Sequence, residues 1–237
     1  MSTVLFHCLP RILSGLSTRL NRVRGSASAA MLVGLGVMGL SVTGLSGCSI
    51  LPKTEPVVFY RLPPVESVYS RVWTPPSLPL TVRIKQPDSS GLLASNRIAV
   101  IPADNQLSAY QGARWASSVP ILFRDQITDA WLQSGRIQHV INDSKPLAAD
   151  RELAGSLRAF QTEYINGQPT VVIHFDAQWI DPNQRTLLAS RRFSVTEPAV
   201  NPEVPAIVAA FGVAQARLSQ ALLEWVLTQP TEQKEAP

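Results

Sequence analysis

Apolar and polar residues follow two patterns from residue 80 onward, one typical of strands and the other of helices. Residues 80–84 alternate apolar with polar side chains, and residues 97–101 form a short apolar run bounded by Asn96 and Pro102. Both segments predict strands. Residues 106–110 and 113–117 are predicted to complete a hairpin with residues 97–101. Residues 136–141 are a further predicted strand.

Between Ser118 and Gly135 the apolar residues recur at spacings of three and four, which predicts an amphipathic helix. Ser117 or Ser118 can cap its first turn, and Pro120 suits that turn because the N–H that proline lacks would have no partner there. Gly135 ends the helix. The apolar face of this helix is formed by Leu122, Phe123, Ile127, Ala130 and Trp131.

The middle of the domain predicts a meander of three antiparallel strands. Residues 152–164 run into Asn166-Gly167, a dipeptide that suits a type I′ hairpin turn because both residues tolerate positive φ. Residues 170–180 form the partner strand, and residues 186–196 follow after a loop. One face of the last two strands is apolar, and it consists of Val171, Ile173, Phe175, Ala177, Trp179, Leu187, Ala189, Phe193 and Val195.

A longer helix is expected near the C-terminus, where Asn201 can act as its cap and Pro202 can take its first position. Its apolar side chains form one continuous stripe: Val204, Ile207, Val208, Phe211, Ala214, Leu218, Leu222 and Trp225. Because the apolar sheet face needs a cover, both helices are expected to pack on it. The sequence therefore predicts a single α+β domain over residues 80–228, with a mostly antiparallel sheet covered by two amphipathic helices. Residues 229–237 are expected to be a flexible tail.

The first 47 residues have the order of a secretory signal peptide: basic, then apolar, then small residues. No Asp or Glu precedes Glu55, and the four arginines of this leader all precede the apolar run of residues 29–45. A membrane-spanning helix needs about 20 apolar residues, and this run is shorter and contains four glycines. It is therefore interpreted as a cleaved segment and not as a lasting anchor.

The leader ends in Leu45-Ser46-Gly47-Cys48, which resembles the bacterial lipobox. In such a motif diacylglycerol alkylates the thiol, the chain is cut between Gly47 and Cys48, and the new amino group is acylated. Cys48 is thus the predicted lipidation site, the other interpretation being a chance cysteine in a plain signal peptide or an uncleaved helix. Because Ser49 and not Asp follows the cysteine, the usual rule for enteric bacteria sends the protein to the outer membrane.

Cleavage before Cys48 changes the charge of the chain. The whole sequence has 21 Lys and Arg against 17 Asp and Glu, but four arginines and no acids lie in the leader, which leaves 17 charges of each sign. A neutral chain without a basic block offers no electrostatic footprint for nucleic acid or for a polybasic membrane patch. Cys8 also leaves with the leader, so the mature chain has no second cysteine for a disulfide.

Seven prolines between Pro52 and Pro79 indicate that residues 48–79 form a lipidated, Pro-rich tether, whose backbone favours extended polyproline II. Residues 57–62 are its one apolar patch and could add a short edge strand to the domain. Fully extended, a tether of this length would reach about 90 Å at about 3.1 Å per residue. Docking of residues 57–62 would shorten that reach.

The sequence contains no motif for catalysis or metal binding. There is no G-x-S-x-G, no H-E-x-x-H, no Gly-rich phosphate loop and no Cys/His cluster, since only His139 and His174 remain after cleavage. No catalytic residue, cofactor or metal site is therefore predicted.

One strand face does combine residues of the kind that hydrolases use. His174 and Asp176 share this face, opposite Ser190, Arg192 and Ser194 on the next strand. A hydrolytic triad also needs an elbow, an oxyanion hole and a pocket, which a flat strand face lacks. A solvated cross-strand pair of Asp and Arg is the favoured interpretation.

Four tryptophans allow two interpretations: Trp115, Trp131, Trp179 and Trp225. They could line a groove for lipid, or they could fill the core. Three of them lie in the apolar stripes, which favours the core.

Several blocks of the mature chain resemble the ABC-type transport auxiliary lipoproteins, to which the PqiC-type lipoproteins belong. They are FYRLPP at residues 59–64, the block from Arg114 to Trp131, the meander of residues 153–198 and the closing helix. The resemblance covers nearly all of the mature chain. It rests on pattern and on a few identities, among them Trp115-Ala116-Ser117 and the spacing from Gly155 to Phe160.

The resemblance implies an outer-membrane lipoprotein that faces the periplasm and works with an MCE-domain protein, which bridges the two membranes and moves lipids. The implied partners are this MCE-domain protein, the membrane through the N-terminal lipid, and a lipid cargo. Only Cys48 carries over as a defined site. Two other functions stay open: a lipoprotein chaperone that binds lipopolysaccharide or outer-membrane proteins, and a hydrolase that uses the His174 face.

Overall fold

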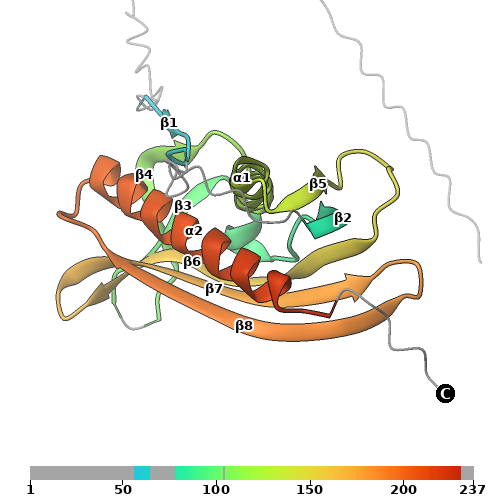
Figure 1. Ribbon diagram of the computed structural model, residues 1–237. Helices are drawn as coiled ribbons and strands as arrows, with labels where there is room; N and C mark the ends of the chain where they lie inside the picture. The colour runs from blue at the N-terminus through green and yellow to red at the C-terminus, as the bar shows by residue number, and fades with distance from the viewer. Residues whose placement is uncertain (1–55, 65–77, 104, 231–237) are drawn as a thin grey trace, which may run out of the picture. The chain divides into compact units, whose positions relative to one another are not determined.

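Three long strands, β6 (Arg151–Ile165), β7 (Gln168–Asp181) and β8 (Thr186–Pro198), form a curved antiparallel sheet in the computed structural model (Figure 1). The structure describes residues 56–64, 78–103 and 105–230. The predicted leader with Cys48, and the predicted tail from residue 231 onward, lie outside these residues. The other elements are β1 (Val58–Tyr60), β2 (Leu78–Ile84), the 3-10 turn η1 (Gly91–Ala94), β3 (Arg97–Ile101), β4 (Ser108–Trp115), α1 (Val119–Ser134), β5 (Ile137–Asn142) and α2 (Val204–Leu227).

Strand β6 lies at the centre of an eight-stranded sheet. β7 pairs with one edge of β6 from end to end. Two shorter strands share the other edge: β2 pairs with the first residues of β6, where Val82 lies opposite Arg151, and β3 pairs with its last residues, where Ala99 lies opposite Gln161. β5 extends the sheet beyond β2, and β4 and then β1 extend it beyond β3.

The expectation of a mostly antiparallel sheet is wrong, because the sheet is mixed. The pairs β1–β4, β2–β5, β2–β6 and β3–β6 are parallel. Strands joined by a short turn are antiparallel, and this holds for β3–β4, β6–β7 and β7–β8. The parallel pairs join strands that are distant in the sequence, and local alternation of apolar residues does not determine which of these become neighbours.

The predicted hairpin turn at Asn166-Gly167 is confirmed. Both residues have positive φ, 52° and 78°, and Ile165 pairs with Gln168 across the turn, as expected for type I′. The predicted hairpin of β3 with residues 106–117 is also present, but its second arm is the single strand β4. Gly112, with a φ of 64°, allows β4 to bend and continue, because glycine adopts this conformation without steric cost.

Both predicted helices are present and lie on the same face of the sheet (Figure 1). α1 has Ser118 at its N-cap and Pro120 in its first turn, and it ends at Gly135, whose φ is 62°. The hydroxyl of Ser118 makes no capping hydrogen bond. The position of the cap was therefore predicted correctly, but its side-chain contact was not.

α2 begins at Val204, and the expectation that Asn201 caps it and Pro202 starts it is wrong. The Asn201 side chain instead accepts a hydrogen bond from the N–H of Glu203 at 3.0 Å and forms a turn ahead of the helix. By length and hydropathy α2 could cross a membrane, but 56% of its most apolar window is buried inside the domain. It packs against β7 and β8 as a core helix of a globular domain does.

The core between helices and sheet is rich in aromatic side chains. The ring of Phe211 on α2 stacks on Phe160 of β6 with 4.7 Å between centroids, and it meets Trp115 edge-on at 5.2 Å. Trp115, Trp131 and Trp179 are fully buried. Trp225, which is 8% exposed, also belongs to the core cluster. The favoured interpretation of the tryptophans as core residues is therefore confirmed for all four.

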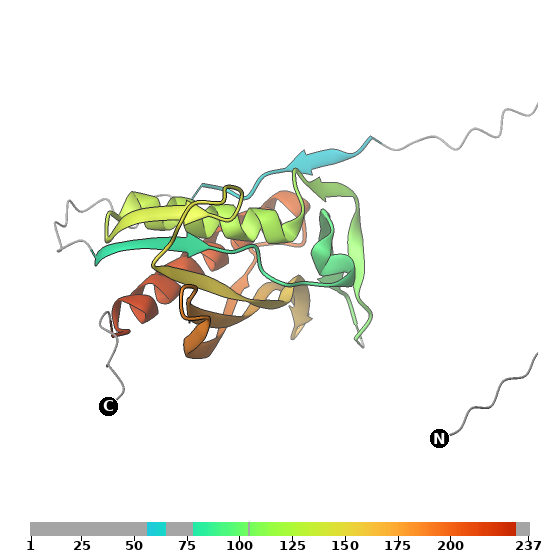
Figure 2. The ribbon, with the colours of Figure 1, turned by 90° about the vertical axis from the view of Figure 1, so that its right-hand side faces the viewer.

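Residues 56–64, called the docked segment below, fasten the N-terminal side of the chain to the domain. β1 adds an edge strand to the sheet, as expected for residues 57–62, and lies beside β4 with Tyr60 opposite Trp115 (Figure 2). The Tyr60 carbonyl accepts the N–H of Ala116 at 2.7 Å. The side-chain amide of Gln126 on α1 donates to the Pro63 carbonyl at 3.1 Å.

Docking shortens the predicted tether. Only residues 49–55 separate Cys48 from the docked segment, and a fully extended chain spans at most about 3.3–3.6 Å per residue. The distance from Cys48 to Pro56 is thus at most roughly 30 Å, about a third of the reach expected for the whole tether.

Replacing Gly212 by alanine is expected to expel the docked segment while α2 stays folded. A Cβ at Gly212 would lie 2.8–3.0 Å from three ring atoms of Pro63, whereas alanine favours a helix interior by about 1 kcal/mol over glycine. Hydrogen exchange should become faster at the Ala116 amide, and the amides of β6 and β7 should keep their protection. The neighbouring exposed change Val213→Ala is the control. Unchanged exchange at Ala116 in Gly212→Ala would contradict the proposed contact.

Candidate functional site

The polar face predicted on β7 and β8 contains an ion-pair cluster around Asp176. The Asp176 carboxylate accepts hydrogen bonds from Nε of Arg192 at 2.5 Å and from Nε of Arg158 at 3.0 Å. The predicted cross-strand pair of Asp176 and Arg192 is therefore confirmed. The hydrogen bond from Arg192, and to a smaller extent the one from Arg158, holds the pKa of the Asp176 carboxyl well below its usual range.

Arg158 was missed by sequence reasoning, because its position depends on the register of β6 against β7. This register shifts between Leu157 and Ala159, so counting residues back from the Asn166-Gly167 turn does not show which side chains of β6 lie near Asp176. An irregularity of this kind leaves no signal in the alternation of apolar residues.

His174 and the two serines are not arranged as a catalytic triad. His174 lies opposite Ser194 and Ser190 lies opposite Gln178 in the register of β7 and β8. A triad places the histidine between the nucleophile and the acid, but here the carboxylate of Asp176 is bound by arginines. An open hollow of about 460 Å³ on this face is lined by Asp176, Ser190 and both arginines, and His174 is not among its lining residues.

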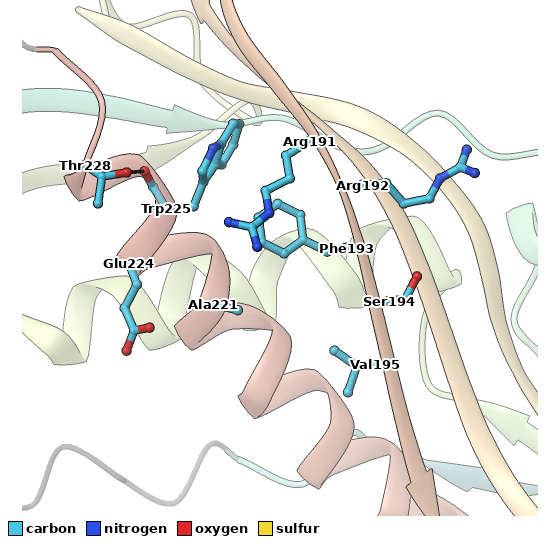
Figure 3. Close-up of a pocket in the computed structure, with 9 residues that line it drawn as sticks. All are labelled: Arg191, Arg192, Phe193, Ser194, Val195, Ala221, Glu224, Trp225 and Thr228. Carbon is cyan, nitrogen blue, oxygen red and sulfur yellow. Dashed lines mark hydrogen bonds between the residues drawn. The ribbon is translucent and has the colours of Figure 1, made fainter.

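A second hollow, of about 490 Å³, opens between β8 and the C-terminal half of α2 (Figure 3). We call it the β8–α2 groove. Its aromatic floor is formed by Phe193 and Trp225, which meet edge-on with 5.6 Å between ring centroids. The guanidinium carbon of Arg191 lies 5.0 Å from the centre of the Phe193 ring, which is within the range of a cation–π contact.

The β8–α2 groove combines an apolar floor with the guanidinium group of Arg191, and Glu224 of α2 also lines it. The guanidinium group of Arg192 points away from the groove and binds Asp176 on the other face of the strand (Figure 3). An aromatic floor offers apolar contact, and guanidinium groups bind phosphate and carboxylate oxygens. The groove can therefore hold a small amphipathic anion. Sequence reasoning considered that Trp225 and the other tryptophans line a lipid groove, but it favoured the core because Phe193 and Trp225 lie in apolar stripes. The signal it did not use was Arg191, two residues before Phe193 and on the same face of β8.

The other predicted sites give no further chemistry. Cys48 and Gly47 lie outside the described residues, so lipidation remains a prediction. Within residues 56–64, 78–103 and 105–230, no three His, Cys, Asp or Glu side chains gather to hold a metal ion.

Comparison with known proteins gives one family match. Residues 60–222 match the family model of the ABC-type transport auxiliary lipoprotein component. An uncharacterised protein of Bradyrhizobium diazoefficiens is 26% identical over 151 residues, which are 64% of this chain and only 40% of that relative. The chain therefore spans about two fifths of the length of this curated relative.

Solved structures share the fold. A crystallised protein from Xanthomonas campestris is 27% identical with a TM-score of 0.60, over 73% of this chain and 92% of its own. A second crystallised protein, uncharacterised and 20% identical, has a TM-score of 0.57 over 73% of this chain and 99% of its own, and it shows similarity of fold alone.

Changing Asp176 to asparagine is expected to have small effects. The partners Arg158 and Arg192 are largely exposed, and such ion pairs contribute little to stability, so the melting temperature should fall by no more than about 2 °C near neutral pH. Because folding lowers the pKa of Asp176, its stabilisation is present above the ordinary Asp pKa of about 3.9 and is lost as the pH falls through the lower folded-state pKa. Thermal unfolding should therefore show the two proteins converging below about pH 4.

The same substitution tests the hydrolase interpretation. Asp176→Asn and His174→Ala are each expected to leave function in cells within a few-fold. A large loss of function with an unchanged melting temperature would favour a catalytic role for this face.

Proposed function

Because the chain belongs to the family of ABC-type transport auxiliary lipoprotein components, we propose that it is a lipid-anchored subunit of an envelope lipid-transport system. In this proposal acylated Cys48 holds it in the outer membrane, and its domain faces the periplasm. The observation that carries the proposal is the family match from residue 60 to residue 222. It includes most of the docked segment and nearly all of the described domain.

The proposed partner is an MCE-domain protein of the same transport system. With a link of at most roughly 30 Å between Cys48 and Pro56, the anchored domain stays close to its membrane. It therefore does not cross the periplasm to meet a partner, and the partner must extend to it. A periplasm-spanning MCE-domain protein has this property, which supports it as the partner.

The β8–α2 groove is the best-formed candidate contact for a lipid cargo. Its floor of Phe193 and Trp225 suits an acyl or glycerol portion, and Arg191 suits an anionic headgroup. Lipopolysaccharide is also an amphipathic anion, so the alternative role as an envelope chaperone would use the same groove. The two functions differ in their partner, which is an MCE-domain protein for lipid transport and lipopolysaccharide or an outer-membrane protein for the chaperone.

Replacing Cys48 by alanine is expected to abolish fatty-acid labelling and to give an uncleaved or soluble protein. Each buried methylene contributes about 0.8 kcal/mol, so two or three acyl chains make attachment effectively permanent, whereas none remains in the variant. Cys8→Ala is the matched control, since this cysteine lies in the predicted leader, and it should keep label and membrane attachment. Labelling of the Cys48→Ala protein would contradict the assignment, and recovery of the wild type solely in the inner membrane would contradict the outer-membrane part.

Affinity purification of the tagged wild-type protein from detergent-solubilised envelopes is expected to recover the MCE-domain protein of its system. The unlipidated Cys48→Ala protein should still bind the purified MCE-domain protein in vitro, but should fail to capture it in cells because it is not held at the membrane. Recovery of lipopolysaccharide or outer-membrane proteins without an MCE-domain protein would favour the chaperone function instead.

A further inference from the structure

Exposed apolar side chains gather at one end of the sheet, where three connections meet. These connections are the β3–β4 loop, the β6–β7 hairpin and the β8–α2 turn. We call the four side chains the loop-end patch: Leu107 (48% exposed), Tyr164 (39%), Ile165 (44%) and Val200 (90%).

Strand register places the three connections together. β3 ends opposite Glu163 of β6, so the loop that follows β3 and carries Leu107 adjoins the β6–β7 hairpin. On the other side of this hairpin, the N–H of Ala199 donates to the Pro169 carbonyl at 2.8 Å, which brings Val200 beside it. In Figure 1 the hairpin tip and the β8–α2 turn lie at the same end of the domain, on the left.

The charged residues at this end are all acidic. They are Asp104, Glu163 and Glu203, within the three connections formed by residues 102–107, 163–168 and 199–203. The loops at the opposite end, 143–150 and 181–186, expose Leu147 and carry exposed charges of both signs: Asp143, Lys145, Asp150 and Arg185. Apolar surface without a positive charge is therefore a feature of the loop end.

The N-terminal side of the chain enters the domain from this end. β1 is parallel to β4, with Val58 opposite Ala113 and Tyr60 opposite Trp115. β4 itself begins at the β3–β4 loop, so the start of β1 points toward the loop end. Phe59, which is 60% exposed, adds apolar surface along this path.

We propose that the loop-end patch is the membrane-contact surface of the anchored domain. The patch lies in the interfacial layer of the bilayer that holds Cys48, and this inference rests on the anchor proposed above. The link from Cys48 to Pro56 is at most roughly 30 Å long and enters at the same end, so the nearest large apolar phase for the patch is the anchoring bilayer. Tyr164, with its apolar ring and polar hydroxyl, suits the interface.

The charge of the patch specifies the kind of lipid surface. The charged residues of the three connections that carry the patch are all acidic, so attraction to anionic headgroups contributes nothing to the contact. Contact should therefore occur on zwitterionic lipid and persist when salt is raised, as expected for burial of apolar side chains.

The test uses the full lipidated protein, with one cysteine introduced as the probe site. Because the proposed processing removes Cys8 with the leader and alkylates the thiol of Cys48, an introduced cysteine is the one free thiol of the mature chain. Ile165→Cys, Val200→Cys and Leu187→Cys are labelled with an environment-sensitive fluorophore, and each protein is reconstituted into phosphatidylethanolamine–phosphatidylcholine vesicles with nitroxide-labelled acyl chains. Leu187, which is 53% exposed in the opposite hairpin, is the matched control.

The expected result is quenching of at least about twofold at positions 165 and 200, with a blue-shifted emission, and emission typical of water at position 187. Added salt should leave the quenching unchanged. Flotation of the same samples with the vesicles reports the anchor separately. Proteins that fail to float would overturn the anchor and the inference that rests on it.

Flotation without quenching at positions 165 and 200 would overturn the loop-end patch as a membrane surface and leave the anchor standing. Equal quenching at position 187 would mean that the domain has no preferred end toward the bilayer, which also overturns the proposal. The proposal would also be overturned if the probe at position 165 showed a blue-shifted emission only after the MCE-domain protein is added, because the patch would then be a protein interface.

Discussion

Strand β6 must satisfy its backbone hydrogen bonds on both edges, and the arrangement of the sheet depends on how it does so. One edge is filled by β7, while the other changes partner from β2 to β3 along its length. At the change, Asp88 bridges the gap: its N–H donates to the Gly155 carbonyl at 2.9 Å, and its carbonyl accepts the N–H of Leu157 at 2.8 Å. Only glycine fits at position 155, because the Cβ of any other residue would lie 2.1 Å from the Asp176 carbonyl oxygen on the β7 side.

The change of partner on β6 also positions the docked segment. Since β3 pairs with the last residues of β6, β4 and β1 follow beyond it. Trp115 at the end of β4 packs edge-on against both Phe160 and Phe211. The Pro63 ring can then lie against α2, where Gly212 leaves room for it. The membrane anchor proposed ahead of β1 would thereby be coupled to the core of the domain and not to a loose extension. This coupling is why the reach of the proposed tether would be short.

Local sequence patterns predicted the features that depend on local physics. The turn at Asn166-Gly167 needs positive φ at both residues, Gly135 ends α1 in a left-handed conformation, and the stripe of α2 must be buried. Features that depend on distant residues were not predictable in this way. The parallel pairing of β3 with β6 joins segments about 60 residues apart, and the contact of Arg158 with Asp176 depends on an irregular register.

The β8–α2 groove is another feature that local sequence patterns do not predict. Its position in the fold bears on how the anchored domain would work. Phe193 and Trp225 belong to stripes that correctly predicted burial, but the hollow depends on how β8 and α2, which are separate elements, lie against each other. α2 begins at the loop end of the sheet and carries the groove in its C-terminal half, away from the loop-end patch (Figure 1). With the loop end on the bilayer, the groove would stand on the part of the domain farther from the anchoring membrane. A partner that extends across the periplasm would meet that part first, so one orientation of the domain would serve both the lipid surface and the partner.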